Sequence, residues 1–210
     1  MVAAFAALGA VVGLVALMVS RYLMTRVADD LGRSPTNLPV WSYGLAVLVG
    51  AVSLARNESE PASSTLLVML SAILLLVQGP IDLVHHRLVR WMSVTALLTA
   101  VVVVVADAML RNLQRSAMTA VLVALTVVVA YGFLHRLSPS SLGWGDVVLV
   151  APLSISIAYV AVERVVAWQL AASVSGAIHA VVARLQRGER SIAYGPHLLV
   201  AAWLTMLISV

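Results

Sequence analysis

The sequence predicts an all-α protein, a polytopic bundle of about eight transmembrane helices that forms a single membrane domain over residues 1–210. Of the 210 residues, 62% are hydrophobic and only 10% are charged, whereas soluble globular domains carry about 25% charged residues. The mean hydropathy is +1.03. Apolar segments recur along the whole chain and leave no room for a separate soluble domain.

Eight apolar segments approach the length that crosses about 30 Å of hydrocarbon at about 1.5 Å per residue. They are residues 2–20, 38–55, 62–81, 91–110, 117–134, 147–162, 165–183 and 195–210. The segment at 147–162 is short and contains Pro152, which is tolerated in a membrane helix where neighbours satisfy the freed carbonyl. The longest predicted loop, residues 21–37, carries a Ser34-Pro35 turn signal. The first segment lacks a basic n-region and a clear cleavage site, so we expect a retained span.

The composition excludes several kinds of function. Cysteine is absent, which removes disulfides, thiolate zinc sites and cysteine nucleophiles. The net charge of +4 comes entirely from arginine and indicates topology before any anionic partner, so we expect the lipid bilayer and not nucleic acid as a partner. No pattern predicts a cofactor, and the adjacent His85 and His86 alone do not make a metal site. The oligomeric state is not indicated.

The arginine positions predict an orientation, because cytoplasmic loops of membrane proteins are enriched in positive charge. Counted over alternate loops, nine arginines lie on one side and four on the other. The nine are Arg21, Arg26, Arg33, Arg87, Arg90, Arg136, Arg184, Arg187 and Arg190, and the four are Arg56, Arg111, Arg115 and Arg164. The side with nine is predicted to be cytoplasmic, with both termini on the other side.

Two aspartates, Asp82 and Asp146, fall at cytoplasmic ends of predicted spans. An ionisable residue at membrane depth is costly unless it is paired, hydrated or protonated, so it is a functional-site hypothesis. Two acids in a partly dry site do not both ionise easily, which leaves one carboxylate and one carboxylic acid. This pair can hydrolyse an amide without metal or covalent intermediate. Gly143 and Gly145 would permit close approach of a substrate strand.

Each aspartate also has a structural interpretation. Asp146 is suited to be the N-cap of the sixth helix, and Asp82 can pair with Arg87 or His86 at the membrane boundary. Capping and catalysis are compatible. The two histidines, His85 and His86, are placed either to modulate the pair of acids or simply to occupy the interface.

Four further features favour structural roles. Asp107 can pair with Arg111 at i+4, on the side away from the two acids. His179 follows Ser175 and Gly176 by about one turn, which suits a hydrogen-bonded contact between helices. Gly195 and Pro196 are suited to start the last helix, with proline in its first turn. The tryptophans fall mostly near predicted interfaces, namely Trp41, Trp91, Trp144, Trp168 and Trp203.

Three motifs together resemble the type IV prepilin peptidases, membrane aspartyl proteases of the Gly-x-Gly-Asp class. The first is Ile81-Asp82 followed by His85-His86-Arg87-Leu88, and the second is Gly143-Trp144-Gly145-Asp146 with Leu149 in the family's leucine position. The third is Ile192-Ala193-Tyr194-Gly195-Pro196-His197, which is similar to the family's Pro-Phe-Gly-Pro. The resemblance covers residues 75–205.

The resemblance implies an endopeptidase of the bacterial inner membrane that cleaves leader peptides from prepilin or pseudopilin precursors at the cytoplasmic face. Asp82 and Asp146 would be catalytic, and Gly143, Gly145, Gly195 and Pro196 would support the site. The chain lacks the cysteine-bearing insertion of the larger members and is similar to the short, peptidase-only form. It departs from the family at Val89, where members carry proline, and at Val148, where they carry lysine.

Two alternatives remain open. The departures at Val89 and Val148 are compatible with a catalytically inactive member that acts as an assembly or scaffold component. A small proton-coupled transporter is the second alternative, because two boundary acids can relay protons. A transporter would more naturally place its acids near the midplane and show an internal repeat, and the sequence has neither feature.

Overall fold

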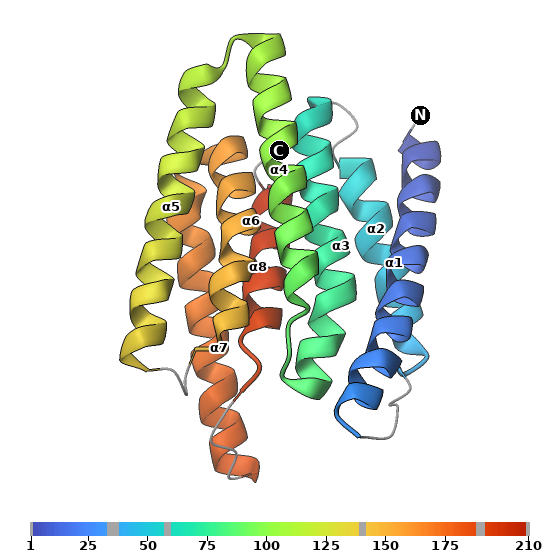
Figure 1. Ribbon diagram of the computed structural model, residues 1–210. Coiled ribbons are helices and arrows are strands. Elements are labelled where there is room, and N and C mark those ends of the chain that lie inside the picture. The colour runs from blue at the N-terminus through green and yellow to red at the C-terminus, as the bar shows by residue number, and fades with distance from the viewer. Residues whose placement is uncertain (1, 33–37, 57–59, 139–141, 188–191, 209–210) are drawn as a thin grey trace.

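The computed structural model describes residues 2–32, 38–56, 60–138, 142–187 and 192–208. The described residues form eight α-helices that run alternately up and down the bundle (Figure 1). They are α1 (Val2–Asp30), α2 (Trp41–Arg56), α3 (Ala62–His85), α4 (Arg90–Arg111), α5 (Gln114–Leu137), α6 (Trp144–Ala161), α7 (Arg164–Arg187) and α8 (Gly195–Ile208). Six helices are long and apolar enough to cross a membrane, while α2 and α8 are shorter. The predicted all-α membrane bundle is confirmed.

The first helix differs from its predicted bounds, because α1 continues to Asp30. Hydropathy falls at Arg21, but the helix persists because side chains beyond that point find local partners. Thr25 donates to the Arg21 carbonyl at 3.0 Å, Arg26 donates to the Tyr22 hydroxyl at 3.1 Å, and the Arg21 guanidinium reaches the hydroxyl of Tyr43 on α2. The helix therefore extends through Asp30, nearly three turns beyond the point at which hydropathy predicts the loop to begin. Arg33, Arg190 and the predicted Ser34-Pro35 turn lie outside the described residues, as do residues 209–210 of the last predicted segment.

Helices α1 and α2 pack with their backbones in direct contact. A Cβ added at Gly9 would lie 2.1 Å from the Gly50 carbonyl oxygen, and one at Gly50 would lie 2.0 Å from the Gly9 oxygen. Gly13 meets Ala46 in the same way, with an added Cβ 2.0 Å from its carbonyl oxygen. Small residues four apart on each helix allow this approach, which maximises dispersion contacts where the hydrophobic effect between helices is absent.

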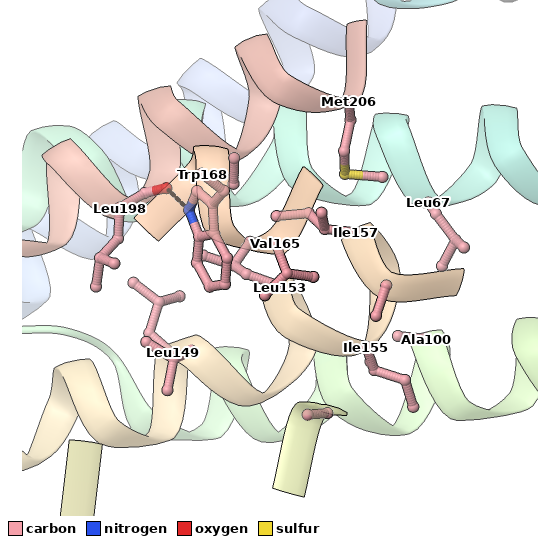
Figure 2. Close-up of a cluster of buried hydrophobic side chains, with 14 of the residues drawn as sticks. Leu67, Ala100, Leu149, Leu153, Ile155, Ile157, Val165, Trp168, Leu198 and Met206 are labelled. Carbon is pink, nitrogen blue, oxygen red and sulfur yellow. Dashed lines mark hydrogen bonds between the residues drawn. The ribbon is translucent and has the colours of Figure 1, made fainter. Parts of the chain in front are cut away.

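The centre of the bundle is built from α3 and α6, the helices that carry Asp82 and Asp146. In each of them 67% of the most apolar window is buried, compared with 17–28% in α1, α4, α5 and α7. Leu149, Leu153 and Ile157 of α6 pack in a cluster with Trp168 of α7, which is fully buried (Figure 2). Its indole N–H donates to the Leu198 carbonyl on α8 at 3.0 Å. Trp168 is thus a core residue and not part of an interfacial belt.

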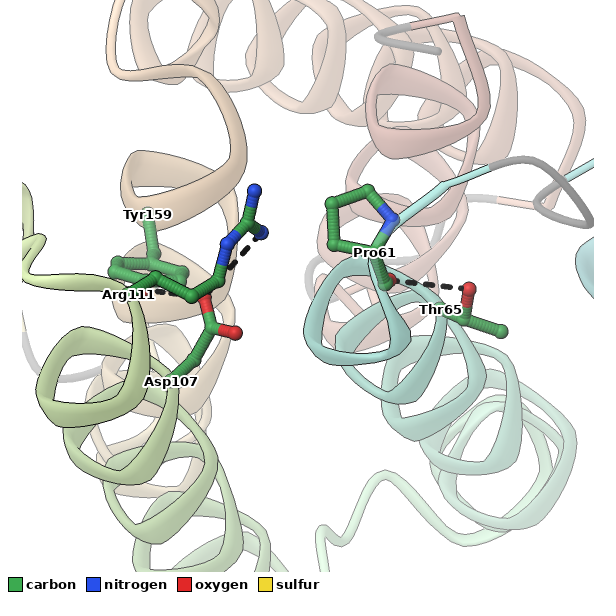
Figure 3. Close-up of polar contacts among 5 residues, drawn as sticks. All are labelled: Pro61, Thr65, Asp107, Arg111 and Tyr159. Carbon is green, nitrogen blue, oxygen red and sulfur yellow. Dashed lines mark hydrogen bonds and ion pairs between the residues drawn. The ribbon is translucent and has the colours of Figure 1, made fainter.

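The end of the bundle opposite to Asp82 holds the contacts of another acid, the partly buried Asp107. Arg111 lies 3.8 Å from Asp107, and the Tyr159 hydroxyl on α6 donates to the same carboxylate oxygen at 2.7 Å (Figure 3). The predicted pairing of Asp107 with Arg111 is confirmed. Thr65, at the start of α3, donates to the Pro61 carbonyl at 3.4 Å in the same view. Asp107 therefore ties α4 to α6 at the end of the bundle away from Asp82.

Adding one methyl group at Gly50 is expected to separate α1 from α2. The Gly50→Ala change should lower the free energy of unfolding by about 1–3 kcal/mol, because its Cβ collides with a backbone carbonyl that has no room to move. Gly44→Ala on the same helix is the matched control, since an added Cβ there meets nothing within 4 Å. It should stabilise the helix by about 0.5–1 kcal/mol. Thermal unfolding in detergent measures the stability of both variants. Equal effects of the two substitutions would contradict the direct backbone contact between α1 and α2.

Candidate functional site

Asp82 and Asp146 come from helices that meet at one end of the bundle. Asp82 lies in the last turn of α3 and Asp146 in the first turn of α6, and both of these helix ends lie at the lower end in Figure 1. Their side chains are buried, with exposed fractions of 5% and 7%. The two carboxyl groups are close enough to interact electrostatically. The structure therefore brings the two predicted acids together at the same end of two central helices.

The Asp146 carboxylate is held by the turn that precedes α6. Gly143 is the N-cap of the helix and Asp146 is its third residue. The Gly143 N–H donates to Asp146 Oδ2 at 3.1 Å, and the Asp146 N–H donates back to the Gly143 carbonyl at 3.1 Å. The expectation that Asp146 is itself the N-cap is wrong, because the Gly143 backbone already has the extended conformation that the N-cap requires. Asp146 nevertheless satisfies an N-terminal donor, as a carboxylate in the first turn does.

The Asp82 carboxylate is held by the start of α8. The Gly195 N–H donates to Asp82 Oδ2 at 3.1 Å in a buried contact between residues 113 positions apart. His86 interacts with Asp82 electrostatically, as one of the structural interpretations expected. The His86 backbone is left-handed, with φ 52°, and its N–H caps α3 by donating to the Asp82 carbonyl at 2.8 Å. The third motif thus contacts the first directly.

Leu88 lies between the glycines of the second and third motifs. A Cβ added at Gly145 would lie 3.0 Å from the Leu88 Cβ. A Cβ added at Gly195 would lie 3.2 Å from Leu88 Cδ2 and 2.7 Å from Asp82 Oδ2. Glycine at both positions is therefore a packing requirement. Pro196 is buried in the first turn of α8, where it was predicted.

A buried glutamine fixes the segment that carries Leu88. Gln78 on α3 is fully buried; its Oε1 accepts from the Val89 N–H at 3.1 Å and its Nε2 donates to Ser93 Oγ at 3.1 Å. Proline, the residue that the resembled family carries at the position of Val89, could not donate this bond. Sequence reasoning missed Gln78, although a lone amide within an apolar segment is a usable signal, because buried amides need partners.

His85 and His86 follow Asp82 in the sequence, whereas His179 and His197 form a pair between α7 and α8. His85 is buried and His86 is exposed. His179 Nδ1 lies 2.9 Å from His197 Nε2, and His197 Nδ1 lies 3.1 Å from Ser175 Oγ, which confirms the predicted helix contact of His179 as one between α7 and α8. Within the described ranges, no three histidine or acidic side chains are grouped closely enough to hold a metal ion.

Two pockets adjoin the acids, and the sequence predicted neither. We call the first the apolar groove; it has a volume of about 410 Å³ and includes Leu45, Leu76, Leu83, Pro196 and Trp203 in its walls. We call the second the polar pocket; it has a volume of about 360 Å³ and is lined by Tyr131, Leu134, Ser138, Leu142, Gln169, Ser173 and Tyr194. Tyrosine and glutamine within apolar segments are the signal that could have indicated the polar pocket.

Comparison of the chain with protein-family models, with curated proteins and with solved structures finds no match. The resemblance to prepilin peptidases therefore stays a prediction. What the described residues provide is a buried pair of aspartates, each held by one backbone N–H, at the end of the bundle where two pockets open.

Replacing Gly195 by alanine is expected to displace the Asp82 carboxylate. The added methyl would lie 2.7 Å from Asp82 Oδ2, so the Gly195→Ala change should lower the free energy of unfolding by about 1–3 kcal/mol. Gly79→Ala is the control on α3, because an added Cβ there makes an ordinary contact of 3.6 Å with Leu75. Thermal unfolding measures both variants. A Gly195→Ala protein as stable as the Gly79→Ala protein would contradict the Asp82 contact.

Proposed function

We propose that the protein is an aspartyl endopeptidase that cleaves the leader peptide of type IV prepilin-like precursors at the cytoplasmic face of a bacterial inner membrane. The observation that carries this proposal is the pair formed by Asp82 and Asp146, two buried acids from different helices that interact electrostatically at one end of a membrane bundle. Their ordered support by Gly143 and Gly195 favours a chemical role, because catalysis requires groups held in place before the substrate arrives.

The proposed reaction needs no group beyond the two acids and water. Both backbone hydrogen bonds go to Oδ2, so Oδ1 of each side chain is assigned to the chemistry. One carboxylate takes a proton from a water molecule as the water oxygen bonds to the scissile carbonyl carbon. The other acid donates a hydrogen bond to the carbonyl oxygen as negative charge develops there. The proton then passes to the amide nitrogen as the C–N bond breaks. The products are a carboxylate and an amine.

The apolar groove supports a substrate with a hydrophobic segment. Its walls are almost entirely apolar and come from α1, α2, α3 and α8. Leu83, which directly follows Asp82, and Pro196, which directly follows Gly195, both line the groove, so the groove lies beside the segments that carry the Asp82 contact. We assign the groove to the apolar segment of the precursor. Side chains of that segment would pack there while the adjoining residues, extended, reach the aspartates.

The alternatives are weakened by particular residues. The departure at Val89 is matched by its hydrogen bond to Gln78, so it does not indicate loss of the site. The alternative of a catalytically inactive scaffold then depends on the departure at Val148, a partly buried residue of α6. A proton-coupled transporter would place its acids near the middle of the spans, whereas Asp82 and Asp146 lie in terminal turns.

Co-expression with a candidate prepilin tests the pair. The wild type is expected to yield mature pilin, and Asp82→Asn or Asp146→Asn should each lower cleavage at least about 100-fold, because each removes an acid or base. Immunoblotting of precursor and product measures this, with equal amounts of each variant in the membrane. Asp107→Asn is the matched control at the far end of the bundle and should cleave normally.

Two outcomes would reject parts of the proposal. Full cleavage by both single aspartate variants would exclude the pair as catalytic. Absence of cleavage by the wild type with every pilin-like protein of the host would favour the scaffold instead.

Photocrosslinking tests the occupant of the groove. A photoreactive residue in place of Leu45, which lines the groove and is 47% exposed, should capture the uncleaved precursor in an Asp82→Asn background. Leu125 on α5 is the control position, because it is 58% exposed on a helix that contributes nothing to the groove. Equal capture at both positions would indicate non-specific contact of the precursor with the lipid-facing surface. Capture of lipid alone at Leu45 would reject the assignment of the groove to the apolar segment of the precursor.

A further inference from the structure

The polar pocket lies on the other side of the aspartates from the apolar groove. Its walls come from α5, α7 and the segments just before α6 and α8, whereas the groove is formed by α1, α2, α3 and α8. Figure 1 shows α5 and α7 at one edge of the bundle and α1 and α2 at the other, with α3, α6 and α8 between them. A chain that passes the aspartates therefore has the groove on one side and the polar pocket on the other.

The polar pocket is lined by residues that neighbour the two glycines whose N–H groups bind the acids. Leu142 directly precedes Gly143, and Tyr194 directly precedes Gly195, so the residues beside each carboxylate-binding N–H also line the pocket. Tyr131 interacts electrostatically with Asp146 from the facing helix. A ligand in the pocket would consequently be adjacent to the Asp146 side of the pair.

The polar groups of the pocket form a network without formal charge. The Tyr131 hydroxyl donates to Gln169 Oε1 at 2.6 Å and lies 3.4 Å from the Tyr194 hydroxyl, which in turn lies 3.5 Å from Ser173 Oγ. Among the residues that the structure describes, the pocket is lined by no aspartate, glutamate, arginine or histidine. Burying an unpaired charge in such a site is costly, so the chemistry of the pocket suits an uncharged ligand.

One buried donor of this network, the side-chain amide of Gln169, lacks an acceptor among the described residues. Gln169 Nε2 is buried and has no hydrogen-bond partner among the residues that the structure describes. A buried amide N–H without an acceptor destabilises a protein, and such groups often mark a position that a ligand completes. A ligand that completes this contact must supply an uncharged hydrogen-bond acceptor, and a peptide carbonyl is such an acceptor.

We propose that the polar pocket binds an uncharged, extended peptide segment of the substrate, with Gln169 Nε2 donating to a backbone carbonyl of that segment. The assignment rests on the proposed function, since it places a second part of the same precursor. The apolar segment lies in the groove, the scissile bond lies between the aspartates, and the segment on the other side of that bond enters the polar pocket. Charged leader residues stay outside it.

A thiol protection experiment tests this binding without any cleavage. The chain contains no cysteine, so Ser173→Cys places a single, exposed thiol in the pocket of the full-length protein in detergent. The probe is the capped tripeptide N-acetyl-Ala-Ser-Gly-amide, and the measurement is the rate of alkylation by iodoacetamide as the probe is titrated. The uncharged peptide should slow alkylation. Its lysine counterpart, N-acetyl-Ala-Lys-Gly-amide, should reach the same degree of protection only at a higher concentration.

Substitution of the glutamine identifies the donor. In the Ser173→Cys background, Gln169→Leu should raise the half-protecting concentration about tenfold, which is the effect of losing one hydrogen bond. Gln114→Leu is the matched control, because Gln114 is exposed at the start of α5 at the opposite end of the bundle. It should leave protection unchanged. Gln169→Leu also removes the acceptor of the Tyr131 hydroxyl, so its thermal unfolding should stay cooperative and fall only slightly below that of the parent, which separates loss of binding from loss of fold.

Three results would overturn the assignment: no protection by either peptide, equal protection of a Ser116→Cys thiol at the far end, or an unchanged half-protecting concentration in Gln169→Leu. Because no bond is broken, the outcome is independent of catalysis. Protection without precursor cleavage would reject the proteolytic function and keep the peptide site, whereas cleavage without protection would reject the peptide site alone.

Discussion

The hydrogen bond from the Gly195 N–H to Asp82 is the contact on which the arrangement of the site depends. It joins the end of α3 to the start of α8 across 113 positions of sequence. Only a residue without a side chain allows this approach, because a Cβ at Gly195 would meet both the carboxylate and Leu88. The start of α8 therefore sets the position of Asp82, and Tyr194, one residue earlier, becomes a wall of the polar pocket.

A compact scaffold surrounds this contact and limits the movement of the two acids. Leu88 packs against Gly145 and Gly195, and Gln78 accepts a hydrogen bond from the Val89 N–H and donates another to Ser93 Oγ. The two helices that carry the acids are also the most buried of the long helices. Tight packing of this kind resists small displacements, which is what a hydrolytic pair needs if one acid is to face water and the other a carbonyl.

The chemical contrast between the two pockets gives the proposed site a direction. Leu83, next to Asp82, lines the apolar groove, and Tyr131, which interacts electrostatically with Asp146, lines the uncharged polar pocket. A substrate that is apolar on one side of the scissile bond and polar on the other would bind in one orientation only, since the reverse would leave polar backbone groups unpaired in the groove. The departures from the resembled family are local, and at Val89 a hydrogen bond takes the place of a rigid ring.

Local physics made much of the protein predictable from sequence, and contacts between helices decided the rest. Hydropathy and segment length predicted the all-α bundle, alternation of spans placed Asp82 and Asp146 at one end, and i+4 spacing predicted the Asp107 pair. Each of these predictions uses only the residues within one span or the number of spans between two residues. The contact of Arg21 with Tyr43, the burial of Trp168 and the partners of Gln78 and Gln169 depend on which helix faces which. That choice is made by close packing of side chains across the whole bundle, which a one-dimensional pattern of hydropathy does not contain.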